Sequence, residues 1–549
     1  MSISKIKITL PLLLAVLYII FFFSFIYSYA ENAPFIDDYN GLFDFLIAYL
    51  NADTLERKFH FLIRQHNEHR IAFPRLVTLL YYYIVGEVNL KYLILLSSLN
   101  LVLLWGVLAK VMYSIKRDLV ALIPMVLLLF HFQHYDNIFW AECSLQNLSV
   151  ACLGVASVWL SVQPGFAHRL FGLVLAVLTT FSSGSGLAIW VVLCLVFILE
   201  AQWKRLLTTV VVGGVSLLFY LRDLELTTVN EPFSIYKRID DVFGTFGLLG
   251  SWIDFREEST NPLAIVAGML SCAIILYPIL RKLWSQRRLD PISLFILGSL
   301  LYIGATAFII NFGRDAYTES RYKIYASIAL LLTYISLYKI VPHTKKNYLK
   351  LTSLALAVIY CGFTTWRYIP EVDKRRHSVL ADLQTILSNQ QTVRTKPFAY
   401  RIEILQKLKA WQPPVEVLRQ EFDWSQQDEH LKSSNVVINE QGDLISVSYE
   451  ELVRNQAYYL YAVSKNFVFF FPIYRQRNSL LDFLKTGQLY SLRKEQKILK
   501  QWLVEGTYQI GIYDPVKKKH AMAYHPAIHV TETATAWLPE RLFNDHLPM

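Results

Sequence analysis

A long series of apolar stretches, separated by short polar ones, constrains this chain more than any other feature of its sequence. A helix needs roughly 20 apolar residues to cross the hydrocarbon core of a bilayer, which is about 30 Å thick. Stretches that approach this length lie near residues 8–30, 90–110, 118–134, 145–162, 169–182, 187–200, 205–221, 263–281, 291–312, 322–341 and 350–369. The sequence therefore predicts an α-helical polytopic membrane protein with about 11–13 transmembrane helices.

The composition excludes several other classes of protein. Hydrophobic residues make up 54% of the 549 residues and charged residues only 17%, whereas a soluble chain carries roughly a quarter charged residues. The net charge of +10 does not indicate a nucleic-acid partner, because the basic residues lie in short loops and in one tail. The five cysteines are scattered through apolar stretches, without the spacing of a metal site or a disulfide set.

Basic clusters between the apolar stretches predict the orientation of the chain, because cytoplasmic loops carry an excess of Lys and Arg. Such clusters lie at 110–117, 204–205, 281–288 and 339–350. With these basic clusters in the cytoplasm, the N-terminus is also cytoplasmic, and we expect the first span to be a retained signal anchor. The C-terminal tail then faces outward, together with the loops 31–71, 135–144, 182–186, 222–262 and 313–321.

The last third of the chain is predicted to form a separate extracytoplasmic domain, residues 370–549, after a transmembrane domain of residues 1–369. A charged linker begins it, and 378–409 has a helical pattern with a polar face. The strand-like runs that follow predict a β-rich, sandwich-like fold, and they lie at Asn435–Ile438, Leu444–Ser448, Tyr458–Val463, Phe467–Ile473, Tyr508–Tyr513 and Ile528–Val530.

Two adjacent acids, Asp37 and Asp38, open the first outer loop directly after the first span. Paired carboxylates at a membrane surface can act as a general base or bind a divalent cation. Either acid could instead cap the amphipathic stretch Asn40–Leu50 as its N-terminal residue. The pair by itself leaves these readings open.

The same loop closes with the polar run His66-Asn67-Glu68-His69-Arg70, and Arg75 follows in Ala72–Val85. The two histidines are three residues apart, so on a helix they would share a face, around a metal or a substrate. Arg70 and Arg75 could hold a phosphate; an ordinary interfacial polar collar is the alternative. At 14 residues, roughly 21 Å as a helix, Ala72–Val85 is short for a span and indicates a half-inserted or interfacial helix.

Three further outer loops hold polar residues that an ordinary membrane turn does not need. The first contains Asp136 and Glu142, and carboxylates at membrane depth usually face a polar cavity. The second, Phe181–Gly186, has three serines and two glycines, which allow a tight hairpin with close backbone approach, or a plain turn. The third contains Arg314, Arg321 and Tyr322. An arginine on the outer side suits an anionic headgroup or a diphosphate, although Glu319 or Asp315 could pair with it instead.

Together these motifs resemble the GT-C superfamily of polytopic glycosyltransferases, which includes protein O-mannosyltransferases and lipid A aminoarabinose transferases. An N-terminal anchor, paired acids in the first outer loop, later outer carboxylates and an external C-terminal domain are the shared arrangement. The stretches His66–Arg70, Asp136–Gln146, Phe181–Gly186 and Gly313–Tyr322 are similar to signature stretches of bacterial GT-C-like proteins. The chain departs from the GT-C pattern at two places. It has Asp37-Asp38 where relatives often have Asp-Glu, and it has His66-Asn-Glu-His-Arg in place of the usual His/Lys-Pro-Pro segment.

The resemblance implies a multi-pass protein of the bacterial cytoplasmic membrane that takes a sugar from a polyprenyl-phosphate donor. The acceptor would be an envelope glycan or glycolipid at the outer face, and transfer would invert the anomeric carbon in a single displacement. Asp37 would be the base, with Asp38 assisting or binding a divalent metal. Cations would stabilise the departing lipid phosphate, namely Arg314, Arg321, Arg70 or Arg75. The substrate would be positioned by His66, Glu68, His69, Asp136, Glu142 and Tyr322.

Three other classes of function also fit a polytopic chain with polar outer loops. A structural or assembly protein would keep its function when Asp37 and Arg321 are lost. A lipid-linked sugar transporter should show repeated halves, and no such repeat is evident. A polysaccharide polymerase or ligase is expected to concentrate its chemistry in one large late outer loop, whereas here the acids lie in the early loop. The sequence therefore favours the glycosyltransferase.

Overall fold

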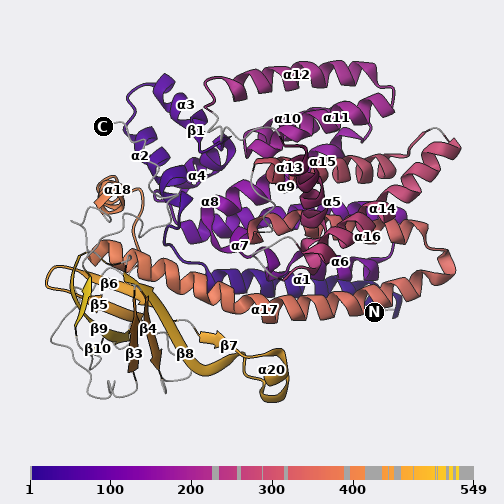
Figure 1. The fold of residues 1–549 in the computed structure, drawn as a ribbon. Coiled ribbons are helices and arrows are strands. Elements are labelled where there is room, and N and C mark those ends of the chain that lie inside the picture. Colours follow the sequence, from indigo (N-terminus) through magenta and orange to yellow (C-terminus); the bar gives the residue numbers. More distant parts are fainter. Residues whose placement is uncertain are drawn as a thin grey trace. The chain divides into compact units, whose positions relative to one another are not determined.

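The computed structural model describes residues 3–225, 234–255, 261–286, 288–313, 319–388, 396–414, 436–442, 444–449, 459–473, 475–500, 503, 505–514, 519–522 and 527–530. It is mostly helical, with a small β region near the C-terminus (Figure 1). The chain divides into two compact units. The first unit consists of Met1–Ser28, Ala52–Leu80 and Tyr92–Tyr368, and the second of Tyr29–Asn51, Tyr81–Lys91 and Ile369–Met549.

The first unit is built from helices and one short hairpin, and α1, α4, α5 and α17 extend beyond its borders into the second. The hairpin strands are β1 (Gln65–His66) and β2 (His69–Arg70). The helices are α1 (Ile3–Tyr29), α3 (Leu55–Ile63), α4 (Ala72–Val85), α5 (Leu90–Ile115), η2 (Leu119–Leu122), α6 (Ile123–Leu129), η3 (Phe132–His134), α7 (Asp136–Phe139), α8 (Ala141–Cys143), η4 (Ser144–Leu148), α9 (Ser149–Ser161), α10 (Phe166–Thr180), η5 (Gly184–Leu187), α11 (Ala188–Leu199), α12 (Trp203–Leu221), α13 (Ile235–Leu249), η6 (Ser251–Ile253), α14 (Pro262–Gln286), α15 (Pro291–Gly313), η7 (Ser320–Tyr322), α16 (Lys323–Ile340), η8 (His343–Lys345) and α17 (Lys346–Ser388).

The apolar helices indicate a multi-pass membrane protein, as the sequence predicts. Within the described ranges, eight helices are long and apolar enough to cross a membrane. Eight of the eleven predicted stretches coincide with these helices. The other three, at 118–134, 169–182 and 187–200, coincide with shorter apolar helices, as does Ala72–Val85.

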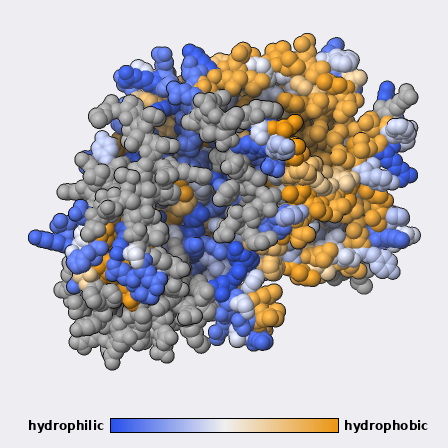
Figure 2. Space-filling view, in the orientation of Figure 1, coloured by the Kyte–Doolittle hydropathy of each residue, from blue (hydrophilic) through white to orange (hydrophobic). Residues whose placement is uncertain are grey.

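The helices of the first unit differ in how much of their surface is covered. α16 is mostly apolar and most of its side chains are buried, which is the pattern of a helix inside a bundle. By contrast, α12 exposes large apolar side chains such as Leu207, Val210 and Leu218. Figure 2 shows a broad apolar surface over the helices of this unit. A surface of this kind suits contact with lipid.

The sequence analysis did not anticipate α13, which lies in the region 222–262 that it treated as a loop. The helix begins at Ser234, whose side chain accepts a hydrogen bond from the Lys237 amide at its N-cap. It packs against α14 and α15, and its other side exposes Ile235, Tyr236 and Ile239. The mixture of charged and apolar residues in this helix kept its hydropathy too low to mark a span.

The second unit contains a β-sandwich, as predicted. One sheet has the order β10-β9-β5-β6, with β11 also paired to β9, and the other has the order β3-β4-β8-β7. Side chains of both sheets share one core, for example Val447 and Ile498 from one and Leu460, Phe469 and Ile510 from the other. The strands are β3 (Val436–Gln441), β4 (Leu444–Tyr449), β5 (Tyr459–Val463), β6 (Val468–Pro472), β7 (Arg475–Arg477), β8 (Tyr490–Leu499), β9 (Gly506–Asp514), β10 (Lys519–Met522) and β11 (Ile528–Val530).

The second unit also contains helices, and they place the acidic loop in the same unit as the sandwich. They are η1 (Asp38–Phe43), α2 (Asp44–Leu50), α18 (Lys396–Lys407), α20 (Leu480–Thr486) and the C-terminal part of α17. Ala381 of α17 packs against Tyr461 and Phe470 of the sheet. α18 contacts η1 and α2. The acidic loop therefore belongs to the same compact unit as the β domain, which its place in the sequence did not indicate.

Candidate functional site

The polar run His66–Arg70 forms a hairpin rather than a helix. His66 and His69 are partners across the two strands, and Asn67 makes the turn with a positive φ of 49°. The expectation that the two histidines share a helical face was wrong, but the hairpin still pairs them. His66 is buried, whereas Glu68 is exposed. Burial, with the nearby charges of Arg75 and His69, lowers the pKa of His66 to about 3, so the ring is neutral at physiological pH.

Arg70 and Arg75 bind main-chain carbonyls at the end of α3. Arg70 donates from Nη1 to the Ile63 carbonyl at 2.7 Å, and from Nε to the Tyr220 carbonyl at 2.5 Å. Arg75 donates from Nη1 to the Phe61 carbonyl at 3.2 Å. The last carbonyls of a helix have no partner within it, so these guanidinium groups cap α3. Phosphate binding by either arginine stays a prediction.

The segment from Asp136 to Leu148 is broken into short helical pieces that end in a π-helical turn, η4. Turns of this kind are frequent at functional sites. Glu142 is almost fully buried at 2% exposure, and it interacts electrostatically with Arg75. The thiol of Cys143 donates to Asn137 Oδ1 at 3.3 Å, and Asn147 Nδ2 donates to the same sulfur at 3.2 Å.

Arg321 lies at the start of the helical segment that becomes α16, where a dense set of contacts holds it. Its Nε forms an ion pair with Glu319 at 2.5 Å, the alternative that the sequence left open. The guanidinium carbon lies 5.7 Å from the centre of the Trp140 ring and 5.1 Å from that of Tyr322. The Arg321 carbonyl accepts a hydrogen bond from Asn137 Nδ2 at 2.6 Å.

These contacts bring two distant segments of the first unit together. The Asp136 amide donates to Ser320 Oγ at 3.2 Å. Cys143 lies within electrostatic reach of Asp136, Glu142 and Arg321. We refer to the group that results, defined by Asp136, Asn137, Glu142, Glu319 and Arg321, as the Arg321 cluster. All five members come from loops that the sequence singled out, but the sequence analysis gave Asn137 no role and named Glu319 only as a partner for Arg321.

The turn after α10 connects this cluster to the histidine hairpin. Gln146 Nε2 donates to Ser183 Oγ at 3.2 Å, and the Phe73 amide donates to the Phe181 carbonyl at 3.0 Å. Gly184 allows a close approach, because a Cβ atom there would lie only 2.7 Å from Nδ1 of His69. The serine–glycine segment is therefore a packed junction rather than a plain turn.

The paired acids lie in the second unit. Asp38 is buried, and its Oδ2 accepts a hydrogen bond from the Phe35 amide at 2.9 Å, which closes a tight turn. Asp37 occupies the N-cap position of η1 but makes no side-chain capping bond. Asp37 is partly exposed and does not cap the helix through its side chain, as the capping alternative would require.

Arginines from far along the chain lie close to this acidic loop within the second unit. Arg376 forms an ion pair with Glu31 at 2.6 Å, and the guanidinium carbon of Arg375 lies 4.0 Å from the centre of the Phe35 ring. Arg401 of α18 binds both carboxylate oxygens of Asp44, at 2.6 and 2.9 Å. Sequence analysis missed all three arginines, because their positions more than 300 residues away give no sign of proximity.

The remaining predicted site residue and the metal have no structural support. Arg314 lies outside the described residues. In the described part of the chain, no group of three or more His, Cys, Asp or Glu side chains is arranged to hold a metal ion.

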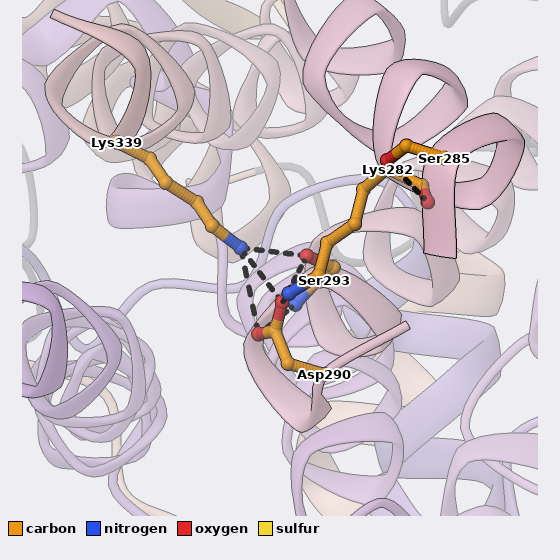
Figure 3. Close-up of polar contacts among 5 residues, drawn as sticks. All are labelled: Lys282, Ser285, Asp290, Ser293 and Lys339. Carbon is orange, nitrogen blue, oxygen red and sulfur yellow. Dashed lines mark hydrogen bonds and ion pairs between the residues drawn. The ribbon is translucent and has the colours of Figure 1, made fainter. Parts of the chain in front are cut away.

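A second polar network, the Asp290 clamp, ties α14, α15 and α16 together (Figure 3). Asp290 forms ion pairs with Lys282 at 2.5 Å and with Lys339 at 3.1 Å. It also accepts hydrogen bonds from the Ser293 hydroxyl at 2.7 Å and the Ser293 amide at 3.0 Å. Burial alone would raise the pKa of Asp290, but the bonds from Lys282 and Ser293 hold it well below its usual range.

Comparisons with protein-family models, with curated proteins and with solved structures found no match to this chain.

Proposed function

We propose that this chain is a membrane glycosyltransferase. It would move a sugar from a polyprenyl-phosphate donor to an envelope glycan or glycolipid on the outer face of the bacterial cytoplasmic membrane. The observation that carries the proposal is the Arg321 cluster, in which carboxylates and a guanidinium group gather at the starts of two apolar segments, Ala141–Ser161 and Ser320–Ile340. The resemblance of the outer loops to GT-C proteins supports the same assignment.

The position of the cluster suits a lipid-linked substrate. The apolar chain of such a donor dissolves in the bilayer while its phosphate stays near the ends of the spanning helices. Helix N-termini and guanidinium groups both attract anions. The carboxylates of Asp136 and Glu142 can accept hydrogen bonds from sugar hydroxyl groups.

The reaction needs one base and one anion-stabilising group. The resemblance to GT-C proteins gives the role of base to Asp37, which would take the proton from the acceptor hydroxyl as its oxygen attacks the anomeric carbon. The bond between that carbon and the phosphate oxygen would break at the same time, and the oxygen would leave with the electron pair. Arg321 would stabilise the charge on the departing lipid phosphate. A single displacement of this kind inverts the anomeric carbon.

Each role is supported by evidence from its own unit. Asp37 is partly exposed and makes no side-chain capping bond to the helix that follows it. Asp38, by contrast, closes the turn at Phe35, which suits a positioning role. Arg321 pairs with Glu319 through Nε, and a guanidinium group has four further N–H donors.

The proposal can be tested by mass spectrometry of surface glycans from cells with and without this gene. Cells that carry Asp37→Asn with Arg321→Ala should lack the same sugar mass as cells without the gene. The matched control is Asp53→Asn with Arg57→Ala, because that ion pair is exposed, with side chains 70% and 68% accessible, and lies in the same outer loop as Asp37. Glycans that do not change when the gene is removed would contradict the proposal and favour transport of lipid-linked sugars.

A further inference from the structure

The hairpin formed by β7, α20 and β8 carries an exposed apolar tip. Figure 1 shows this hairpin projecting from the two sheets of the second unit. α20 has no buried residue. Its leucines Leu480, Leu481 and Leu484 are 39%, 68% and 69% exposed, and apolar atoms mark the same place in Figure 2.

The tip is held in a defined conformation and is not a frayed end. The Ser479 hydroxyl accepts a hydrogen bond from the Asp482 amide at 3.1 Å and caps the first turn. Gly487 ends the helix in the left-handed region, at φ +67°. Asn478 Nδ2 donates to the carbonyls of Gln488 and Tyr490 at 2.9 and 3.1 Å. A helix of this length is unstable by itself, so these bonds are needed to present the leucines.

The three leucines share one side of α20, because residues at i, i+1 and i+4 lie on neighbouring positions of a helix. The hairpin around them is basic: between residues 474 and 494 there are five Lys and Arg and one Asp. An apolar helix face with basic flanks is typical of segments that lie in the surface of an anionic bilayer.

We propose that the α20 tip inserts into the surface of the membrane that the chain itself spans, with its leucines among the acyl chains and its basic flanks on anionic headgroups. The bilayer is always available to this domain, because α17 continues from an apolar segment of the first unit into the second. Tethering of this kind gives a high effective concentration, so a small tip suffices. This inference does not depend on the glycosyltransferase proposal.

The test uses the full chain in nanodiscs, with one fluorophore placed on the tip. Leu481→Cys and Leu484→Cys are labelled with a polarity-sensitive dye, and Gln488→Cys, an exposed polar position of the same hairpin, is the matched control. The native cysteines, which all lie in the first unit, are replaced by alanine. Lipids brominated in their acyl chains quench a dye that reaches them.

We expect quenching at positions 481 and 484 but not at 488, and stronger quenching in discs that contain phosphatidylglycerol than in discs of phosphatidylcholine alone. Equal, unquenched, water-like emission at all three positions would overturn the proposal. A blue-shifted but unquenched dye at 481 would also overturn it, because the tip would then be covered by protein. Quenching that is independent of phosphatidylglycerol would remove the proposed role of the basic flanks.

Discussion

The Asp290 clamp and the Arg321 cluster both place charged side chains among apolar helices, but they balance charge in opposite ways. In the clamp, one carboxylate accepts from two lysines and a serine. The cluster contains three carboxylates, of which Asp136 and Glu319 act on Arg321 and Glu142 acts on Arg75. The clamp has excess positive charge and the cluster excess negative charge.

The contrast indicates different roles. Every group of the clamp that Figure 3 labels is bound to a neighbour within it, and the clamp links three helices, as expected of a network that stabilises a fold. The cluster instead gathers residues of two outer loops that the sequence singled out for function, at the starts of two apolar segments. We therefore expect mutations in the clamp to lower stability and mutations in the cluster to lower activity.

The largest effect is expected for Arg321→Ala. Sugar transfer should fall by about 10²–10³-fold, because loss of one group that stabilises a developing anion has that effect in other enzymes. The thermal unfolding midpoint in detergent should also fall, because Glu319 loses its partner, so transfer is compared per folded molecule. The measurement is transfer by the purified chain from a polyprenyl-phosphate sugar, with Arg57→Ala as the control. Transfer at the wild-type rate would exclude Arg321 from the reaction.

The Asp290→Ala substitution should have the opposite profile. It leaves Lys282 and Lys339 close together without their shared carboxylate, and this should destabilise the fold by about 3 kcal/mol, less if water enters to screen the two lysines. Transfer per folded molecule should not change. The measurement is chemical unfolding in detergent, followed by assay of the folded fraction. A loss of transfer without a loss of stability would reverse the assignment of the two networks.

Much of the fold could be predicted because hydropathy and alternation are local signals. The apolar stretches marked the long helices, and the expected strands coincide with β3, β4, β5, β6, β9 and β11. Hydropathy and alternation did not reveal helices and strands in which polar residues are mixed with apolar ones. β8 carries four charged residues among ten, so its alternation is weak, and α13 mixes charges with apolar residues in the same way.

The candidate site was predictable only as a set of separate motifs. Asp136, Glu142 and Arg321 were noticed because carboxylates and outer arginines are unusual near a membrane. Their association through Asn137 and Ser320 depends on tertiary packing, which one sequence does not reveal. The same limit applies to Arg375 and Arg401, whose place near the acidic loop follows from the fold of the second unit.

A smaller effect should link stability to pH through His66, beside the cluster. The folded protein binds a proton at His66 only near pH 3, whereas the unfolded chain does so near pH 6.5. Stability should therefore fall as the pH is lowered, by about 2 kcal/mol between pH 6.5 and pH 5. His66→Gln should reduce this dependence when unfolding is measured across that range. His60→Gln, at an exposed histidine, should not change it.

The smallest effect is expected at the junction that joins the hairpin to the cluster. In Gly184→Ala the new Cβ atom would lie 2.7 Å from Nδ1 of His69, so the imidazole must shift, at a cost of about 1 kcal/mol. If His69 positions substrate, KM should rise while the unfolding midpoint falls only slightly. Gly214→Ala is the matched control, because nothing lies within 4 Å of its Cβ position, and alanine there should be neutral or slightly stabilising. An unchanged KM in Gly184→Ala would limit the site to the cluster itself and leave the histidine hairpin as its scaffold.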